Sequence, residues 1–266
     1  MFSASDAYER FMGRWSRQLA PVFLAFADVR PGDVVLDAGC GTGALASAVL
    51  TVPGTRVVGV DPSGAYLQAA RAHAVAPRAT FEEGDVQRLR FADAAFDRTL
   101  SMLVLNFVPD PARALGEMVR VTRPGGVVAA AVWDYGDGME MLRVFWDEAV
   151  AFDPAIERRD ERHMPLSRSG ELETLWRDHG LTAVEATALR IPLVFSSFDD
   201  FWLPFVGGQG PAGAYVSALA AERRAALGAR LRTRLVTDPA GSLTLDARAW
   251  AVKGVVPPAN GGQPKR

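Results

Sequence analysis

The stretch that decides the fold is VVLDAGCGTGALA, residues 34–46, in which an apolar run ends at an aspartate and a glycine-rich turn leads into a helical pattern. A hydrophobic strand followed by a glycine loop and a helix opens a doubly wound α/β sheet, where ligands bind beside the loop. Gly39, Gly41 and Gly43, with Ala44 after them, also satisfy the spacing of a dinucleotide-binding loop. The stretch therefore predicts a nucleotide-like ligand and leaves open whether that ligand carries phosphates.

Acidic residues stand where three successive predicted strands end. Asp37 closes the first strand, Asp61 closes the second in VVGVDPS, and Asp85 follows the third in FEEGDV. A carboxylate two residues before the first glycine would repel a pyrophosphate and attract an ammonium group. Asp61 is placed to accept the two hydroxyls of a ribose, and Asp85 with Val86 to hold an adenine. The three positions favour an adenosine ligand that carries positive charge instead of phosphate.

Strands and helices alternate through the first half of the chain, which indicates a parallel sheet covered by helices. We expect a helix before the first strand, with Asp6 as its N-cap and Glu9 three residues on. The predicted strands are residues 34–37, 56–60, 79–83, 96–101 and 127–133, and the predicted helices between them are residues 44–50, 63–74 and 111–122.

The alternation stops after Trp133, and residues 134–169 are predicted to form an insertion. The arginines of the predicted helix at residues 214–235 indicate a solvated outer face, with an anionic acceptor or a membrane surface as the alternatives. The elements expected in this half are helices at 140–152 and 169–178, a strand at 181–195, a helical block at 198–235 interrupted by a loop at 207–213, and a strand at 242–252.

Composition excludes several classes of protein. The 29 basic and 31 acidic residues give a net charge of -2, without the cationic excess of a nucleic-acid binder. The lone cysteine, Cys40, fits a reducing compartment, so we expect a cytoplasmic location. No run reaches the roughly 18 apolar residues of a membrane span. The segment LAPVFLAFA at residues 19–27 mimics a signal peptide, but Asp6 and Glu9 precede it and the segment has a helical pattern, so we expect it to belong to the folded protein.

Together these segments make the chain resemble class I S-adenosylmethionine-dependent methyltransferases, within them the small-molecule type 11 group related to ubiquinone and menaquinone methyltransferases. The resemblance implies a Rossmann-like, doubly wound sheet of seven strands, the seventh antiparallel, with helical insertions that form a lid over the acceptor. The segments that carry it are VVLDAGCGTG at 34–43, GVDPS at 59–63, GDVQRLRFADAAFD at 84–97, EMVRVTRPGGVVAAAVWD at 117–134 and YERFMGRWS at 8–16.

The resemblance also implies the extent of the domain. A single methyltransferase domain is expected over residues 1–256, followed by a disordered tail at 257–266. Within that domain the expected cofactor-binding core is residues 28–135, and the expected helical insertions over the acceptor site are residues 136–168 and 198–238.

The implied cofactor is S-adenosylmethionine, with S-adenosylhomocysteine as the product and no metal. By resemblance the glycine loop passes close to the methionine portion, Ser101 offers its backbone to the amino group, and Asp37 acts through water and loop geometry. Tyr8 and Arg14 would close over the cofactor, with Arg14 as partner of its carboxylate. The complete expected set of cofactor-binding residues is Tyr8, Arg14, Asp37, Gly39, Cys40, Gly41, Asp61, Pro62, Asp85, Val86 and Ser101.

The acceptor is expected to be a small molecule, and no residue is nominated as catalytic. The aromatic residues Trp146, Phe201, Trp202 and Phe205 suggest an apolar or aromatic acceptor, although packing of a helical core explains them equally well. The segment NFVP, which begins at Asn106, does not match the motif of amide- and adenine-methylating enzymes. The acceptor atom and the oligomeric state stay open.

Two other functions compete with methyl transfer. A nicotinamide-dependent oxidoreductase would use the glycine loop for a dinucleotide, although Asp37 disfavours it. A non-catalytic S-adenosylmethionine-binding protein would keep the same fold and cofactor residues without turning over an acceptor.

Overall fold

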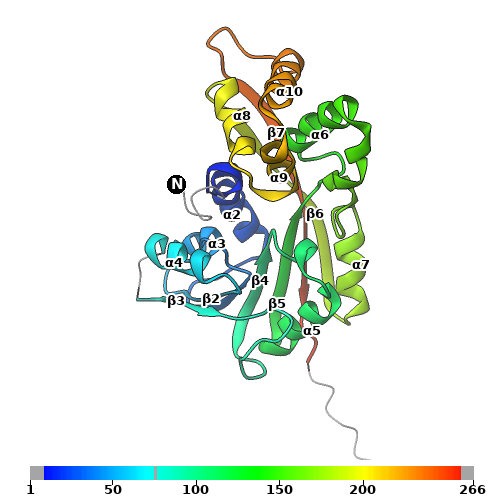
Figure 1. Cartoon of the computed structure of the whole chain (residues 1–266). Coiled ribbons are helices and arrows are strands. Elements are labelled where there is room, and N and C mark those ends of the chain that lie inside the picture. Colours follow the sequence, from blue (N-terminus) through cyan, green and yellow to red (C-terminus); the bar gives the residue numbers. More distant parts are fainter. Residues whose placement is uncertain (1–8, 75–76, 259–266) are drawn as a thin grey trace, which may run out of the picture. The chain divides into compact units, whose positions relative to one another are not determined.

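The computed structural model describes residues 9–74 and 77–258 (Figure 1). Its seven strands form one sheet in the order β3-β2-β1-β4-β5-β7-β6. None of the helices in the described ranges is both long and apolar enough to cross a membrane. The strands are β1 (Val34–Ala38), β2 (Arg56–Asp61), β3 (Ala79–Glu83), β4 (Phe96–Met102), β5 (Thr122–Trp133), β6 (Thr182–Phe195) and β7 (Leu243–Val255).

The chain divides into two compact units, and the longer strands β5, β6 and β7 have residues in both. The core unit consists of Ala20–Ala131, Gly170–Thr187 and Ala251–Arg266, and the helical unit consists of Met1–Leu19, Val132–Ser169 and Ala188–Trp250.

The core unit is built on four parallel pairings. β1 pairs with β2 on one side and with β4 on the other, β2 pairs with β3, and β4 pairs with β5. The strand β1 is almost completely buried along its length, as expected for a strand covered by helices on both faces. The presence of these five strands was predicted correctly from the sequence.

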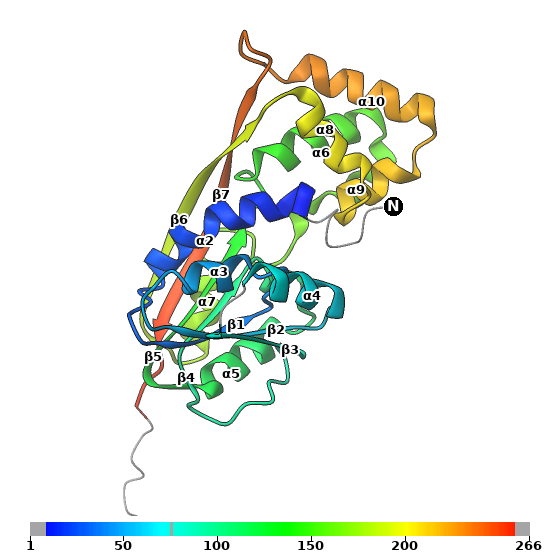
Figure 2. The ribbon, with the colours of Figure 1, turned by 90° about the vertical axis from the view of Figure 1, so that its left-hand side faces the viewer.

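The helices of the core unit cover opposite faces of the sheet. The helices α3 (Ala44–Val49) and α4 (Gly64–His73) lie on one face, and α5 (Pro111–Val121) lies on the other (Figure 2). This follows from right-handed crossovers, because the chain leaves β1 toward β2 in one direction and leaves β4 toward β5 in the other. The crossovers diverge between β1 and β4, which makes that place the switch point of the sheet, where ligands bind in open α/β folds.

Side-chain caps explain where two helices of the core unit, α4 and α5, begin. The Ser63 hydroxyl accepts a hydrogen bond from the Tyr66 amide at 3.3 Å and caps α4. Asp110 caps α5 by accepting from the Arg113 amide at 2.9 Å, and Pro111 fills the first helical turn. Such caps satisfy amides that have no partner within the helix.

The seventh strand is antiparallel and lies between β5 and β6, as the resemblance implied. Val256 follows β7 and exchanges backbone hydrogen bonds with Gly125 and Gly126 at 2.8 and 2.9 Å. Near the other end of β5, the Asp134 amide donates to the Arg248 carbonyl at 2.9 Å. The residue numbers run in opposite directions along these contacts, which fixes the antiparallel orientation.

The helical unit contains α6 (Glu140–Phe152), α8 (Phe198–Val206), α9 (Gly210–Ala218) and α10 (Ala221–Arg234). Phe145 stacks on Phe205 with ring centroids 4.5 Å apart, and Phe201 lies 5.3 Å from Phe205. These three side chains are fully buried, so aromatic packing supplies much of the apolar core of this unit. The first turns of α2 (Arg14–Phe26), preceded by the π-helical turn Glu9–Gly13, also belong here, whereas α7 (Glu171–Asp178) belongs to the core unit.

Three predicted boundaries were wrong. The strand β5 begins at Thr122 instead of Val127, because its Pro-Gly-Gly segment pairs with the end of β7 instead of forming a free turn. The loop expected at residues 207–213 ends early, since α9 already begins at Gly210. The single helix expected at 214–235 is two helices, because Leu219 and Ala220 take extended backbone angles between α9 and α10. The predicted N-cap Asp6 and the tail from residue 259 lie outside the described residues.

Candidate functional site

The glycine loop between β1 and α3 is fixed to the neighbouring strand. The amides of Gly39 and Cys40 both donate to the Val60 carbonyl, at 2.8 and 2.9 Å. A Cβ on Gly39 would lie 2.5 Å from the Val104 side chain, whereas a Cβ on Gly41 would have no heavy atom within 4 Å. Gly39 is thus required by packing against the loop after β4, while Gly41 borders open space that a ligand can approach.

Asp37 is a buried carboxylate with an unused acceptor. Its side chain is 1% exposed, and its Oδ2 atom has no hydrogen-bond partner among the described residues. Burial raises the pKa of Asp37 to about 7. The negative charge of Asp61 also raises this pKa, whereas a hydrogen bond from the Ala46 backbone lowers it. A cationic group beside Oδ2 would restore the charged form, because an opposite charge lowers a carboxyl pKa.

Asp61, at the end of β2, contacts the glycine loop with one oxygen and the start of α4 with the other. Oδ2 accepts from the Gly41 amide and Oδ1 from the Ser63 amide, each at 2.9 Å. Burial raises the pKa of Asp61, although these two backbone hydrogen bonds oppose that change. Each carboxylate oxygen has a second lone pair, so Asp61 can accept further hydrogen bonds from a ligand.

The remaining predicted residues of the core unit differ in exposure. The carboxylate of Asp85 is exposed and accepts from the Gln87 amide at 2.8 Å, in a turn that leaves Val86 buried. The Ser101 hydroxyl is fully buried and donates to the Ala38 carbonyl at 2.9 Å, which ties β4 to β1. Pro62 is exposed at the end of β2.

Cys40 is not a nucleophile in this arrangement. Its thiol is buried, and burial together with the charges of Asp37 and Asp61 raises its pKa far above the usual range. The thiolate, which is the reactive form, is therefore suppressed. The expectation of a packed small residue fits this environment.

The two N-terminal residues of the predicted set are not among the described residues of the core unit. Tyr8 lies outside the described residues. Arg14 belongs to the helical unit, where its Nη1 pairs with Asp200 Oδ1 at 2.8 Å and its guanidinium lies over the Trp15 and Phe195 rings. The structure thus gathers nine predicted residues in the core unit: Asp37, Gly39, Cys40, Gly41, Asp61, Pro62, Asp85, Val86 and Ser101.

Sequence reasoning missed the environment of Asn106. It lies in a short 3-10 turn, Leu105–Phe107, after β4, and is 4% exposed. Neither its Nδ2 nor its Oδ1 atom has a hydrogen-bond partner among the described residues. The sequence placed Asn106 in a loop after a strand, and only the folded chain shows that its amide is buried.

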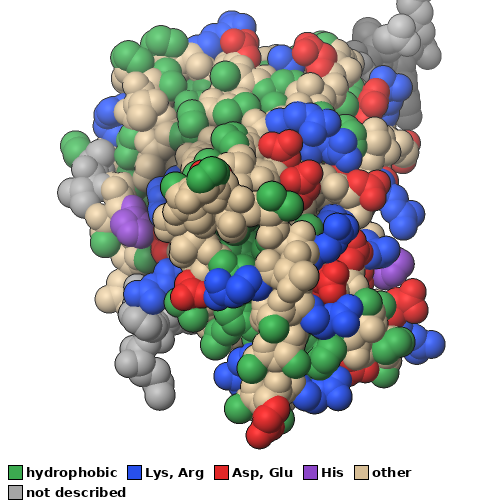
Figure 3. All heavy atoms as spheres, turned by 90° about the horizontal axis from the view of Figure 1, so that it is seen from above, with side chains coloured by type: hydrophobic (Ala, Val, Ile, Leu, Met, Phe, Trp, Pro, Cys, Tyr) green, Lys and Arg blue, Asp and Glu red, His purple; other side chains and the backbone are tan. Residues whose placement is uncertain are grey.

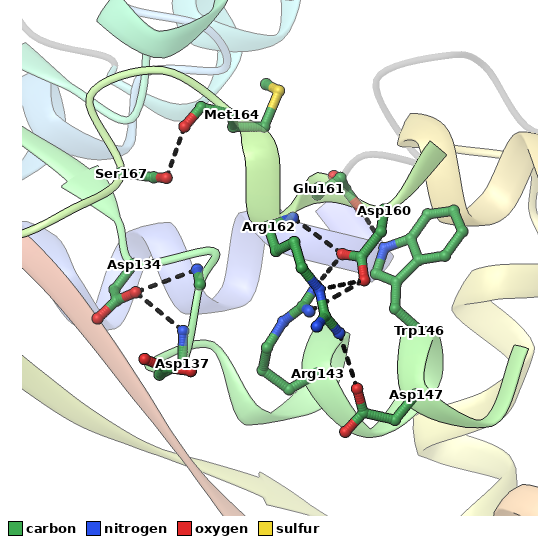
Figure 4. A network of polar contacts seen from close by, with 11 residues as sticks. Asp134, Asp137, Arg143, Trp146, Asp147, Asp160, Glu161, Arg162, Met164 and Ser167 are labelled. Atoms are coloured by element: carbon green, nitrogen blue, oxygen red, sulfur yellow. Dashed lines mark hydrogen bonds and ion pairs between the residues drawn. The ribbon is translucent and has the colours of Figure 1, made fainter. Parts of the chain in front are cut away.

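The helical unit contains a buried network of charges (Figure 4). Asp160 receives hydrogen bonds from Arg143 and from Arg162, whose Nε lies 2.6 Å from Oδ2. Beside it, the Trp146 indole donates to Glu161 Oε2 at 2.9 Å. Burial raises the pKa of Glu161 to about 7, although that hydrogen bond and the charge of Arg143 oppose the change. Glu161 is therefore a titratable group in the segment predicted to cover the acceptor.

The aromatic residues expected around the acceptor belong to the core of the helical unit. Trp146, Phe201 and Phe205 are fully buried and contact other aromatic rings. Trp202 is half-buried and lies close to Gly228. Core packing accounts for the first three side chains, so they do not indicate an aromatic acceptor.

Four arginines of α10 are paired with acidic side chains of the same unit, and Arg224 donates to the Ser217 and Leu219 carbonyls. Figure 3 shows Lys and Arg side chains interspersed with Asp and Glu side chains on the face that it presents. Exposed pairs of this kind contribute at most about 1 kcal/mol each, and they offset part of the positive charge of α10. The pairs are Arg223–Asp153 at 3.3 Å, Arg230–Glu148 and Arg232–Asp199 at 3.0 Å, and Arg234–Glu148 at 3.9 Å.

Comparison with known families agrees with the geometry of the core unit. A family model described as a methyltransferase domain matches residues 36–130, which include the end of β1, the glycine loop, Asp61, Asp85 and Asn106. Residues 36–130 belong to the type 11 family of class I methyltransferase domains. The predicted family and fold are thereby confirmed.

Relatives of this methyltransferase domain extend the comparison. The malonyl-(acyl-carrier protein) O-methyltransferase of Pectobacterium atrosepticum is 38% identical over 142 residues, 53% of this chain and 54% of that protein. The chain spans about half the length of the curated relatives it matches.

Two solved structures share the fold at low sequence identity. The YcgJ protein of Bacillus subtilis is 19% identical with a TM-score of 0.58, covering 92% of this chain and 100% of that one. Phosphoethanolamine N-methyltransferase 2 of Haemonchus contortus, in complex with phosphomonomethylethanolamine and S-adenosylhomocysteine, is 20% identical with a TM-score of 0.59, covering 95% and 57%.

Proposed function

We propose that this chain is an S-adenosylmethionine-dependent methyltransferase that acts on a small-molecule acceptor. The observation that carries the proposal is Asp37, a buried carboxylate with an unpartnered oxygen at the glycine loop of a methyltransferase domain. The ammonium of the cofactor's methionine portion would give that oxygen the positive partner that burial demands. A pyrophosphate would instead place negative charge near Asp37.

The residues of the core unit fit this cofactor. Gly41 leaves open space beside the loop, and the free lone pairs of Asp61 suit the two ribose hydroxyls. Asp85 is exposed with Val86 buried beside it, so an adenine could receive a polar and an apolar contact from adjacent residues. Arg14 and Tyr8 are proposed as additional cofactor contacts on the strength of the sequence resemblance.

Methyl transfer from S-adenosylmethionine requires the protein mainly to align the acceptor with the methyl group. Bound S-adenosylmethionine supplies an electrophilic methyl group on its sulfonium. The proposed part of this chain is to hold the cofactor at the switch point, present the acceptor in line and exclude water, and such positioning can supply much of the rate enhancement.

The first test is a calorimetric titration of the protein with S-adenosylmethionine, S-adenosylhomocysteine and NADH. We expect dissociation constants near 1 μM, about -8 kcal/mol, for the first two ligands and no heat for NADH. Binding of NADH alone would favour the oxidoreductase and overturn the assignment of Asp37.

Asp61→Ala tests the cofactor site itself. Loss of two hydrogen bonds to a charged group should weaken S-adenosylhomocysteine binding at least about a hundredfold. Asp93→Ala is the matched control, because Asp93 is 78% exposed in its side chain and pairs only with Arg120 on the surface of the same unit. Unchanged affinity in Asp61→Ala, with a normal unfolding temperature, would refute the proposed site.

An acceptor screen separates an enzyme from a non-catalytic binder. The relatives make malonyl-acyl-carrier protein and phosphoethanolamine the first acceptors to test. Transfer of a radiolabelled methyl group to any acceptor establishes catalysis, whereas cofactor binding without transfer to a broad panel would favour the binding protein.

A further inference from the structure

Within the core unit, the buried polar groups left without partners lie at neighbouring strand ends. Among its described residues, the buried side-chain nitrogen and oxygen atoms without a hydrogen bond are Asp37 Oδ2 and the two amide atoms of Asn106. Asp37 lies near the carboxyl end of β1, and Asn106 follows the carboxyl end of β4. Those strands are neighbours, and they flank the switch point of the sheet.

The loop that carries Asn106 is in contact with the glycine loop. The Val104 side chain occupies the space where a Cβ of Gly39 would lie, with its Cγ1 only 2.5 Å from that position. The turn itself is ordered, since the Phe107 amide donates to the Val104 carbonyl at 2.8 Å. Asn106 is therefore held next to the proposed cofactor site by backbone and packing that do not involve its own amide.

We infer that the Asn106 amide is a ligand-binding group of this crevice, an inference that rests on the proposed function. A buried amide without partners costs free energy, and a leucine of similar size would avoid that cost. A ligand that brings an N–H or O–H donor to Oδ1 would compensate for the part of that cost that comes from the oxygen. Oδ1 of Asn106 and Oδ2 of Asp37 are both acceptors, so the structure assigns them to a ligand that presents hydrogen-bond donors.

Two sources could present such a donor in a methyltransferase. One is the ammonium of the cofactor's methionine portion, and the other is the N–H or O–H of the acceptor at the transferring methyl. Three probes distinguish these two donors. S-adenosylhomocysteine carries the ammonium of the amino-acid portion only, and sinefungin carries that ammonium and a second amine on the carbon that replaces the methylated sulfur. 5′-Methylthioadenosine lacks the amino-acid portion and carries neither donor.

The experiment is calorimetry of the three probes with wild type and Asn106→Leu, supported by thermal unfolding of the free proteins. We expect the unfolding temperature of Asn106→Leu to equal or exceed that of wild type, because the unpartnered amide is removed. Affinity for sinefungin should fall about tenfold or more, as for one lost hydrogen bond to a charged group, while affinity for 5′-methylthioadenosine stays the same.

The two sources give different results. An equal loss for S-adenosylhomocysteine and sinefungin assigns Asn106 to the cofactor's ammonium, and a loss for sinefungin alone assigns it to the acceptor position. Unchanged affinity for both probes overturns the inference, and so does an equal loss for all three, which would mean a general disturbance of the site. A wild-type protein that binds none of the probes overturns the proposed function and this inference with it.

Two further variants serve as a replacement for Asn106→Leu and as a control. Asn106→Ala serves if the leucine variant does not fold, and the same pattern of affinities is expected of it. Phe107→Leu is the matched control in the same turn, because the Phe107 side chain is 56% exposed. Its affinities for the three probes should equal those of wild type.

Discussion

Replacing Glu161 by glutamine should change how the stability of this protein depends on pH. Glu161 is 6% exposed and accepts a hydrogen bond from Trp146. Because burial raises its folded-state pKa to about 7, the folded protein retains a proton that the unfolded chain loses near its ordinary value of 4.5. Stability from this group is therefore fully present below that value and is lost as pH rises through 7.

The magnitude follows from the two pKa values. Between pH 5 and pH 8, linkage with a folded pKa of 7 and an unfolded pKa of 4.5 predicts a loss of about 2.5 kcal/mol from Glu161 alone. Glutamine keeps an oxygen for the Trp146 indole and does not titrate. Relative to wild type, Glu161→Gln should therefore gain about 2.5 kcal/mol of unfolding free energy as the pH is raised from 5 to 8.

Urea denaturation followed by tryptophan fluorescence at pH 5, 6, 7 and 8 measures this shift. Glu157→Gln is the matched control, since Glu157 is exposed in the same segment and should leave the pH dependence unchanged. Parallel curves for Glu161→Gln and wild type would refute the reasoning, because they would mean that Glu161 is charged in the folded protein near pH 5.

Two further predictions concern the glycine loop. Asp37→Asn removes a carboxylate whose pKa is raised by burial to about 7. Above pH 7 the variant should therefore be more stable than wild type in urea denaturation. In calorimetry it should bind S-adenosylhomocysteine about tenfold or more weakly, and unchanged affinity would contradict the proposed contact between Asp37 and the ligand. Gly39→Ala places a methyl group 2.5 Å from Val104 at a φ of +84° and should cost about 2–4 kcal/mol. Gly41→Ala, at +51° in open space, should cost about 1–2 kcal/mol, and equal losses in urea denaturation would contradict the difference in packing.

The core unit could be predicted from sequence because its signals are local. The strand-loop-helix pattern around Gly39 and the caps at Ser63 and Asp110 depend on neighbouring residues only. The prediction of one helix over residues 214–235 was wrong because local signals alone do not show where that helix is interrupted. Its helical pattern continues through Leu219 and Ala220, and nothing in the local sequence marks the extended backbone that separates α9 from α10.

Burial of single polar groups could not be predicted in the same way. Asp37 and Asp61 were identified as ligand residues by their place after strands, but the unpartnered Oδ2 of Asp37 depends on the packing of the whole loop. Glu161 looks like any residue of the charged run ERRDERH, and only the folded chain places it against the Trp146 indole. Tertiary contacts decide which carboxylate of a charged run is exposed and which has its pKa raised by burial.

The buried acceptors of the charge network and those of the switch point differ in whether the chain itself supplies their hydrogen-bond donors. In the helical unit Asp160 is neutralised by Arg143 and Arg162, and Glu161 is stabilised by an indole N–H, so these groups are satisfied without a ligand. At the switch point of the core unit, Asp37 and Asn106 keep acceptors that no described residue satisfies. Substitutions there should raise stability and lower ligand affinity together, and a purely structural residue would not show that opposition.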